Sequence, residues 1–211
     1  MPHTQDRFPI CHIFASIQGE GYWVGRPMAF VRVWGCPLSC AWCDEPLHRD
    51  PQAVQYLTAQ EILTHVQRVA PGIPNLLLTG GEPLAVAGLQ HLVACFKQAG
   101  YWLAMESSGI GGEVPQGLDW LTLSPKPHHP PPASILAQAQ EIKFIVDAHP
   151  SPTFQAIINQ QAQHHPHVWV QPKARGSEID PHAVARCVEM VLAGAGKLRL
   201  SLQVHKWIKI A

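Results

Sequence analysis

The sequence predicts an α/β fold, an incomplete TIM-like barrel of about six parallel strands with helices on its outside. Short apolar runs alternate with amphipathic helical patterns along the chain, and this alternation favours a mostly parallel sheet with right-handed crossovers. A complete eight-stranded barrel typically takes about 250 residues, whereas the chain has 211. We therefore expect a single domain, residues 1–211, whose sheet does not close.

The first half of the chain contains two predicted strands and two predicted helices. The strands are the apolar runs at residues 28–34 and 75–81. Thr58 and Glu61 have the spacing of a capping box, and apolar residues then recur at helical spacing, which predicts a helix over residues 58–70. Residues 89–96 show the same periodicity, and Gly100 ends this second helix.

Five further apolar runs predict strands in the second half. They cover residues 101–107, 119–124, 141–147, 168–172 and 198–207, and helical patterns of varying clarity separate most of them. Residues 107–118 contain too many glycines for a crossover helix. This missing helix is a second reason to expect an incomplete barrel.

The composition excludes several classes of protein. Apolar residues make up 46% of the chain, charged residues 14%, and the formal net charge is zero, which argues against a broad electrostatic surface for nucleic acid. No run approaches the length of a membrane span, and the N-terminus lacks the pattern of a secretory signal. Because the isolated cysteines Cys11, Cys95 and Cys187 also fit a reducing compartment, we expect a cytoplasmic protein that binds neither nucleic acid nor membrane.

Polar residues follow four of the predicted strands at the point where each strand ends. They lie at residues 79–82, 106–109, 124–126 and 171–173. In sheets of this kind, ligands bind at the carboxyl ends of the parallel strands. The four segments together therefore predict one ligand site at this edge of the sheet.

The segment GCPLSCAWCDE contains three of the six cysteines, Cys36, Cys40 and Cys43, in a stretch of eight residues. A tetrahedral zinc ion would need a fourth ligand, which His48 can supply. A cubane iron–sulfur cluster normally takes four thiolates, so three thiolates leave one iron with an open coordination position. The spacing alone leaves both interpretations open, and the loop at residues 36–43 is short enough to surround one cluster.

The spacing C-x3-C-x2-C, with Trp42 before the last cysteine, resembles the radical S-adenosylmethionine (radical SAM) enzymes. The segment TGGEP at residues 79–83 resembles the glycine-rich segment of that superfamily, and ESSG at residues 106–109 resembles its ribose-contacting strand end. The resemblance implies a [4Fe–4S] cluster on Cys36, Cys40 and Cys43, with S-adenosylmethionine at the open iron. Cleavage of this cofactor would give a 5′-deoxyadenosyl radical.

A narrower resemblance covers nearly the whole chain. Residues 14–45, FASIQGEGYWVGRPMAFVRVWGCPLSCAWCDE, resemble the 7-carboxy-7-deazaguanine synthase (QueE) family, and the later segments LLLTGGEPL, SPKP, EIKFIVD, WVQP and LSLQVHKWI match in the same order. The resemblance implies a lyase of queuosine and 7-deazapurine biosynthesis. The expected reaction contracts the ring of 6-carboxy-5,6,7,8-tetrahydropterin to 7-carboxy-7-deazaguanine, with loss of ammonia.

The resemblance and the chemistry of this substrate together predict the substrate-binding residues. Gln18 can pair with the amide edge of the pterin, and Glu20 can accept from its amino group. Arg32 is the natural bidentate partner of the carboxylate. The complete expected set is Ile17, Gln18, Gly19, Glu20, Arg32, Thr79 and Ala211, with His205 and Lys206 as further polar groups nearby.

The resemblance also implies the residues that bind S-adenosylmethionine. Gly81 lets the backbone approach a ligand closely, and Glu82 can pair with an ammonium group. The expected set is Trp42, Asp44, Gly81, Glu82, Ser107, Ser124, Pro125, Lys126 and Gln171. The same resemblance implies a flavodoxin or ferredoxin as the reductant and a homodimeric assembly.

One position departs from the family pattern. The family usually has threonine directly after the Cys-Asp pair, and its hydroxyl ligates a magnesium ion that contacts the substrate, whereas this chain has Glu45. A carboxylate is a good ligand for a hard cation, so we expect Mg²⁺ at Glu45. The alternative is that the glutamate replaces the ion with its own charge, hydrogen bonds or a salt bridge.

Two other functions compete with this interpretation. A glycyl-radical activating enzyme shares the cysteine spacing, but the segment SIQGEG and the absence of further ferredoxin-type cysteine clusters in the sequence count against it. A non-catalytic zinc or iron–sulfur module is the alternative from a different class. Substitution of any of the three clustered cysteines damages the protein under all three hypotheses.

Overall fold

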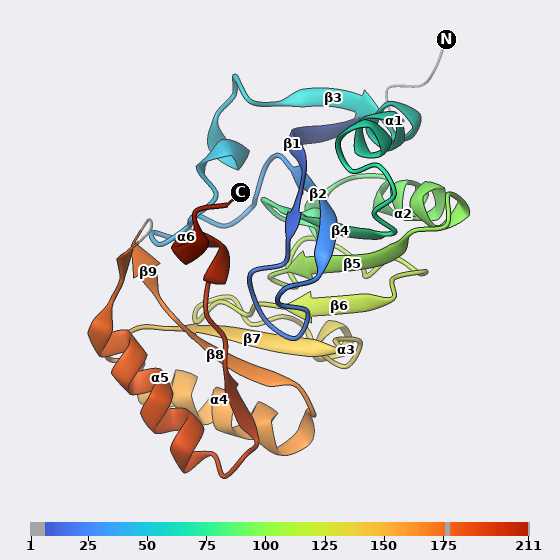
Figure 1. Cartoon of the computed structure of the whole chain (residues 1–211). Helices are drawn as coiled ribbons and strands as arrows, with labels where there is room; N and C mark the ends of the chain where they lie inside the picture. Colours follow the sequence, from blue (N-terminus) through green and yellow to red (C-terminus); the bar gives the residue numbers. More distant parts are fainter. Residues whose placement is uncertain (1–6, 176–177, 211) are drawn as a thin grey trace.

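A nine-stranded sheet forms the centre of the structure, a computed structural model that describes residues 7–175 and 178–210 (Figure 1). Its strand order is β11-β8-β7-β6-β5-β4-β2-β1-β3. The strands from β2 to β11 pair in parallel: β2 (Pro27–Val33), β4 (Asn75–Gly80), β5 (Trp102–Ser107), β6 (Trp120–Leu123), β7 (Glu141–Val146), β8 (Val168–Pro172) and β11 (Leu198–Leu200). In the described part of the chain the two edge strands do not pair with each other. The partial barrel that the sequence predicts is confirmed.

Two antiparallel strands extend one edge of this sheet. β1 (Arg7–Ile17) pairs with both β2 and β3 (Gln55–Thr58), and neither β1 nor β3 was predicted from the sequence. Pro9, Cys11 and His12 interrupt the apolar alternation of β1, which hides its strand pattern. The end of β1 is important for the site, because it leads directly into the segment at residues 17–20.

The prediction of a strand at residues 198–207 is wrong for the second half of this range. Pairing of β11 with β8 ends at Leu200, and residues 204–208 form the short helix α6 (Val204–Ile208). The amide of Ser201 still donates to Val170 O of β8 at 2.9 Å, whereas the amide of Val204 donates to Gly19 O at 3.0 Å, outside the sheet. This crossing brings the C-terminal segment over the carboxyl ends of the strands.

Helices cover the outer face of the sheet (Figure 1). α1 (Ala59–Val69) begins with the predicted capping box of Thr58 and Glu61, and α2 (Leu89–Gln98) follows β4. The connection at residues 107–118 contains no helix, as predicted. The remaining elements are α3 (Ala133–Leu136), α4 (Pro152–His164), α5 (Pro181–Ala193), the 3-10 turns η2 (Pro46–Arg49) and η3 (Pro83–Ala85), and the paired strands β9 (Ala174–Arg175) and β10 (Glu178–Ile179). None of the helices in the described residues has the length and hydropathy of a membrane span.

Side chains alternate between two different environments along each parallel strand, because successive residues of a strand point to opposite faces. On the outer face, Val31, Leu78 and Met105 are buried in the same cluster as residues of α1 and α2. On the opposite, inner face, the amino ends of the strands carry an aromatic cluster that includes Trp102 and Trp120. The carboxyl ends of the inner face instead carry the polar residues Arg32, Thr79, Glu106, Lys143 and Gln171.

The end of β4 is joined closely to the start of the loop that carries the clustered cysteines. The amide of Gly81 donates to Val33 O and the amide of Glu82 donates to Gly35 O, both at 2.9 Å. A Cβ atom on Gly81 would lie 2.0 Å from the carbonyl oxygen of Gly35. Glycine is therefore required at position 81 so that two backbone segments can meet at the foot of this loop.

Gly81→Ala is expected to lower the free energy of unfolding by about 3 kcal/mol, because overpacking against backbone cannot relax by a side-chain movement. The melting temperature should fall by about 6–12 °C. Gly72→Ala is the control: Gly72 has φ +76° but no atom within 4 Å of an added Cβ, so only the left-handed backbone conformation is penalised, by about 1–2 kcal/mol. Equal losses in thermal denaturation of the two variants would contradict the close approach of Gly81 and Gly35.

Candidate active site

A cavity of about 490 Å³ opens at the carboxyl ends of the parallel strands. Its volume lies within the range of about 300–1,000 Å³ that is typical of small-molecule sites. Each of the four polar strand-end segments contributes to its wall, as the sequence predicted. The cavity also includes the segment after β1, the cysteine loop and the C-terminal segment around α6, so distant parts of the chain share one site.

The three clustered cysteines all line this cavity and are free thiols. The loop between them is fixed by backbone contacts: Leu38 N–H points to Cys36 Sγ at 3.4 Å, and Cys43 N–H donates to Cys40 O at 3.2 Å. Within the described residues, no three His, Cys, Asp or Glu side chains converge closely enough to hold a single metal ion. Three free cysteines on one cavity wall are a donor set that suits an iron–sulfur cluster, in which each thiolate binds a different iron.

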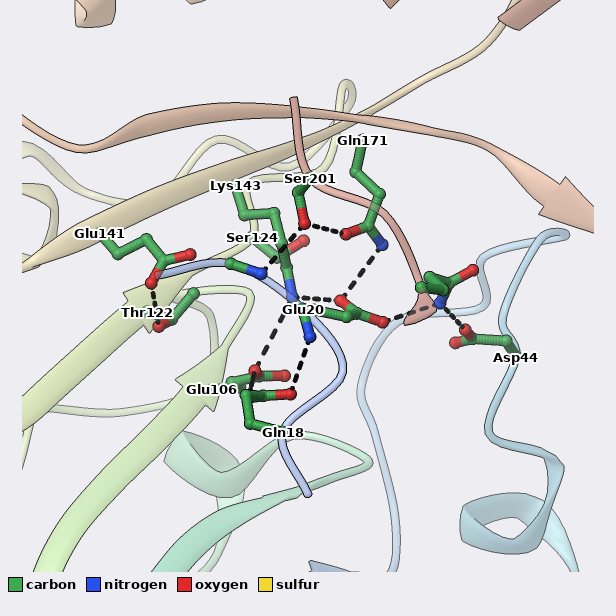
Figure 2. A network of polar contacts seen from close by, with 12 residues as sticks. Gln18, Glu20, Asp44, Glu106, Thr122, Ser124, Glu141, Lys143, Gln171 and Ser201 are labelled. Carbon is green, nitrogen blue, oxygen red and sulfur yellow. Dashed lines mark hydrogen bonds and ion pairs between the residues drawn. The ribbon is translucent and has the colours of Figure 1, made fainter. Parts of the chain in front are cut away.

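Lys143 lies at the centre of a buried charge network (Figure 2). Its ammonium group contacts Glu20 Oε2 and lies 3.7 Å from Glu106 Oε1, and only 5% of its side chain is exposed. Burial alone would lower the pKa of Lys143, but Glu106 and Glu20 raise it above its usual value. Burial likewise acts to raise the pKa of Glu20, and Lys143 holds it below its usual value. Lys143 and Glu20 are therefore both charged at neutral pH.

A chain of amide side chains extends this network to the cysteine loop (Figure 2). Gln171 donates to Glu20 at 3.1 Å and accepts from the Ser201 hydroxyl at 2.7 Å. Gln203 donates to Glu20 Oε1 at 2.8 Å and also lies 2.7 Å from Asp44 Oδ2. The residue after Cys43 is thus connected to Glu20 through a single side chain.

Asp44 is held as a carboxylate by a second cation. Lys206 donates to Asp44 Oδ2 at 2.9 Å. Burial acts to raise the pKa of Asp44, but the charge and hydrogen bond of Lys206 lower it to about 2. Lys206, together with His205, lines the cavity, so the C-terminal segment belongs to the site.

The segment after β1 presents its polar groups to the same network. Gln18 is buried, donates from Nε2 to Glu106 at 2.9 Å and accepts from the amide of Glu20 at 3.1 Å. Ile17 and Gly19 line the cavity beside it. The four predicted residues of this segment are therefore brought together, and their side-chain amide and carboxylate are oriented by other protein groups.

Arg32 and Glu45 form an ion pair at 2.7 Å between Nη1 and Oε2. The other carboxylate oxygen of Glu45 accepts from the amide of Leu47 at 3.2 Å and so caps η2. The residue expected to bind the substrate carboxylate is thus paired with the residue expected to bind magnesium. A salt bridge of this kind is one of the two roles that the sequence leaves open for Glu45.

Glu82, one of the predicted cofactor residues, is only 1% exposed. Its carboxylate accepts from the hydroxyl of Ser107 at 2.6 Å, from the amide and hydroxyl of Ser108, and from the amide of Leu84 at 3.0 Å. These bonds join the ends of β4 and β5. The carboxylate is therefore fully occupied by protein donors, although Glu82 also borders the cavity.

The other predicted residues differ in how the structure places them. Lys126 donates to Ser124 Oγ at 2.9 Å, and burial lowers the pKa of Lys126. Pro125 is not part of the cavity wall, and Ala211 lies outside the described residues. The remaining predicted residues on the wall are Trp42, Thr79 and Gly81.

Lys143 and Gln203 were not predicted as site residues, although both line the cavity. For Lys143 the sequence contains a signal: Glu141 and Lys143 stand two residues apart in an otherwise apolar strand, which indicates one polar face. Gln203 has no such signal, because its position depends on where the chain leaves β11.

Comparisons with known proteins agree with this geometry. Residues 33–126 match the model of the radical SAM superfamily. A 7-carboxy-7-deazaguanine synthase of Synechocystis is 31% identical, covering 96% of this chain and 93% of the relative, and one of Haemophilus influenzae is 30% identical, covering 98% and 95%. The crystal structure of QueE from Escherichia coli superimposes with a TM-score of 0.77 at 27% identity, covering 94% of this chain and 95% of that one.

Similarity over the full length of these relatives, a shared fold and the cysteine loop within the matched superfamily region all point to one family. The chain belongs to the 7-carboxy-7-deazaguanine synthase family of radical SAM enzymes.

Proposed function

We propose that this protein is a 7-carboxy-7-deazaguanine synthase. It would act as a lyase that contracts 6-carboxy-5,6,7,8-tetrahydropterin to 7-carboxy-7-deazaguanine with loss of ammonia. The observation that carries the proposal is one cavity that is lined by three free cysteines together with Gln18, Glu20 and Arg32. These are the polar groups that a carboxylated pterin requires, beside the thiols that a cluster requires.

Cys36, Cys40 and Cys43 are proposed to hold a [4Fe–4S] cluster, because three free thiols line one cavity within the region that matches the radical SAM superfamily. A reduced cluster held there would supply the one electron that cleaves bound S-adenosylmethionine to methionine and the 5′-deoxyadenosyl radical. This chain positions the cofactor through the surrounding wall. The proposed contacts are Trp42, Asp44, Gly81, Glu82, Ser107, Ser124, Pro125, Lys126 and Gln171, of which all but Pro125 line the cavity.

The substrate is proposed to bind at the inner face of the sheet. Gln18 and Glu20 are held by Glu106 and Lys143, so their hydrogen-bonding groups are oriented before the pterin arrives. Such preorganisation reduces the entropy that binding must overcome. Arg32 would bind the carboxylate of the pterin, either in place of Glu45 or together with it. The expected contact is bidentate, which is the geometry that guanidinium groups favour. Ile17, Gly19, Thr79 and Ala211 complete the proposed set.

Magnesium is proposed to bind at Glu45 together with the substrate. The Oε2 atom of Glu45 is at present paired with Arg32, and a cation bound there without another anion would repel the guanidinium. The substrate carboxylate removes this conflict, because it can pair with Arg32 while an Mg²⁺ ion takes Glu45. Carboxylate oxygens with retained waters are the usual ligands of this ion.

The electron donor and the assembly are proposed from family membership. A flavodoxin or ferredoxin of the cytoplasm would reduce the cluster, and the chain would form a homodimer. Trp42 and Cys43 lie on the wall of the open cavity, and Cys43 is exposed. An exposed thiol near the rim is compatible with electron transfer from an external protein.

The function is tested by an anaerobic assay of the reconstituted protein with 6-carboxytetrahydropterin, S-adenosylmethionine and dithionite. We expect 7-carboxy-7-deazaguanine, detected by mass spectrometry, at a rate that rises on adding Mg²⁺. In Glu45→Gln the response to Mg²⁺ should fall by about tenfold or more, because a neutral amide oxygen is a weaker ligand for a hard cation.

The outcomes separate the parts of the proposal. Cofactor cleavage without this product would keep a radical enzyme and reject the substrate. An unchanged rate in the presence of a chelator would reject a role for magnesium. The carboxylate of Glu45 would then substitute for the ion by its own charge. Failure to cleave the cofactor, with an intact reduced cluster, would reject the radical function.

Arg32→Ala should slow pterin turnover by about 10–100-fold, since a hydrogen bond to a charged group contributes about 1.5–3 kcal/mol. The turnover of Arg32→Lys should lie between those of wild type and Arg32→Ala, because lysine keeps the positive charge but cannot bind a carboxylate in bidentate geometry. Cluster content and cofactor cleavage should be preserved. Arg32→Ala also leaves Glu45 unpaired, so Glu45→Gln and Arg32→Ala/Glu45→Gln are compared as well, and the difference between these two variants gives the loss that is due to Arg32 alone. Wild-type pterin turnover in Arg32→Ala would refute the assignment.

A further inference from the structure

The segment after the cysteine loop folds back onto the loop and buries a histidine. His48 lies in η2 and is 2% exposed. Its carbonyl oxygen accepts from the amide of Gly35 at 3.0 Å, and the indole of Trp34 donates to Asp50 O at 2.9 Å. Two contacts with the end of β2 therefore fix the position of His48 relative to the start of the loop.

The ring of His48 is directed at one of the clustered cysteines. Its Nε2 atom lies 3.2 Å from Cys43 Sγ. Its Nδ1 atom is buried and has no hydrogen-bond partner among the described residues. A proton on Nδ1 would bury an unpaired donor, whereas a proton on Nε2 points at sulfur. When Cys43 is an iron-bound thiolate it can only accept, so the Nε2–H tautomer is the one that satisfies both groups.

We propose that His48 is a positioning residue that donates its Nε2–H to the sulfur of Cys43 and raises the reduction potential of the cluster held there. The inference rests on the proposed function, in which Cys36, Cys40 and Cys43 bind a [4Fe–4S] cluster. A hydrogen bond to a ligating sulfur withdraws electron density and stabilises the reduced cluster. His48 therefore makes the cluster easier to reduce without binding iron itself.

Other contacts in the loop do not duplicate this one. Cys36 receives the backbone amide of Leu38 at 3.4 Å, a longer contact that no side-chain substitution removes. Arg49 reaches the backbone oxygen of Cys40 at 3.5 Å and not its sulfur. Cys43 is the most exposed of the three cysteines, so its sulfur would otherwise be hydrogen-bonded by water. The buried ring of His48 holds its N–H in a more fixed position than a water molecule would.

The test is an EPR-monitored redox titration of the reconstituted wild type, His48→Leu and His48→Gln. At the wild-type midpoint potential, His48→Leu should show a ratio of reduced to oxidised cluster about tenfold lower, equivalent to 59 mV for one electron. His48→Gln places an amide N–H near the position of Nε2 and should stay within about twofold of wild type. His167→Leu is the matched control, because His167 also has a buried unpartnered Nδ1 but packs on Tyr22 and Trp120.

An unchanged midpoint in His48→Leu would overturn the proposal. An equal shift in His48→Leu and His48→Gln would also overturn it, because the ring would then act through packing alone. If His48→Leu fails to assemble a cluster, pulsed EPR of wild type labelled with ¹⁵N-histidine decides the question. A weak nitrogen coupling is expected, whereas no coupling, or one as large as that of an iron-bound nitrogen, would contradict the hydrogen bond. Wild type without any cluster would refute the proposed function instead.

Discussion

The buried ammonium group of Lys143 is the constraint on which the rest of the site depends. Removing a charge from water is unfavourable unless an opposite charge and hydrogen bonds compensate it. Glu20 and Glu106 provide that compensation, and they come from the segment after β1 and from β5. A single cation on β7 thereby fixes the end of an antiparallel strand against the centre of the parallel sheet.

The network around Lys143 also couples the two halves of the cavity. Glu20 is bound by Gln203, which in turn contacts Asp44 beside the last of the clustered cysteines. The residues proposed to bind the pterin are therefore positioned relative to the cysteine loop by a short chain of polar contacts. A reaction that begins with hydrogen abstraction needs this, because the reacting atoms must be held close and correctly oriented.

Much of this site was predictable from the sequence, and the exceptions have physical causes. The cysteine spacing and the polar strand ends predicted one cavity, because carboxyl ends of parallel strands meet at one edge. The role of Lys143 depends on which strands are neighbours, and a single strand does not contain that information. The alternating pattern of residues 198–207 resembled a strand, but the chain turns into α6 where the amide of Val204 bonds to Gly19 O, and this long-range contact cannot be seen in a local pattern. The sequence marks Glu82 as a ligand-binding candidate beside glycines, but it does not show that the same carboxylate bonds to donors at the end of β5, because that contact depends on the pairing of β4 with β5.

The charge compensation at Lys143 is tested most directly by the unfolding midpoint of Lys143→Met, measured anaerobically on the reconstituted protein. In the wild type, Lys143 lowers the pKa of Glu20 against the effect of burial. In the variant only burial remains, and it raises the pKa of Glu20. The variant should therefore be destabilised by about 3–5 kcal/mol near pH 8, and by clearly less near pH 5.5, where Glu20 can take up a proton. The same loss of stability at both pH values would contradict the account, because it would show that Lys143 contributes packing and not charge.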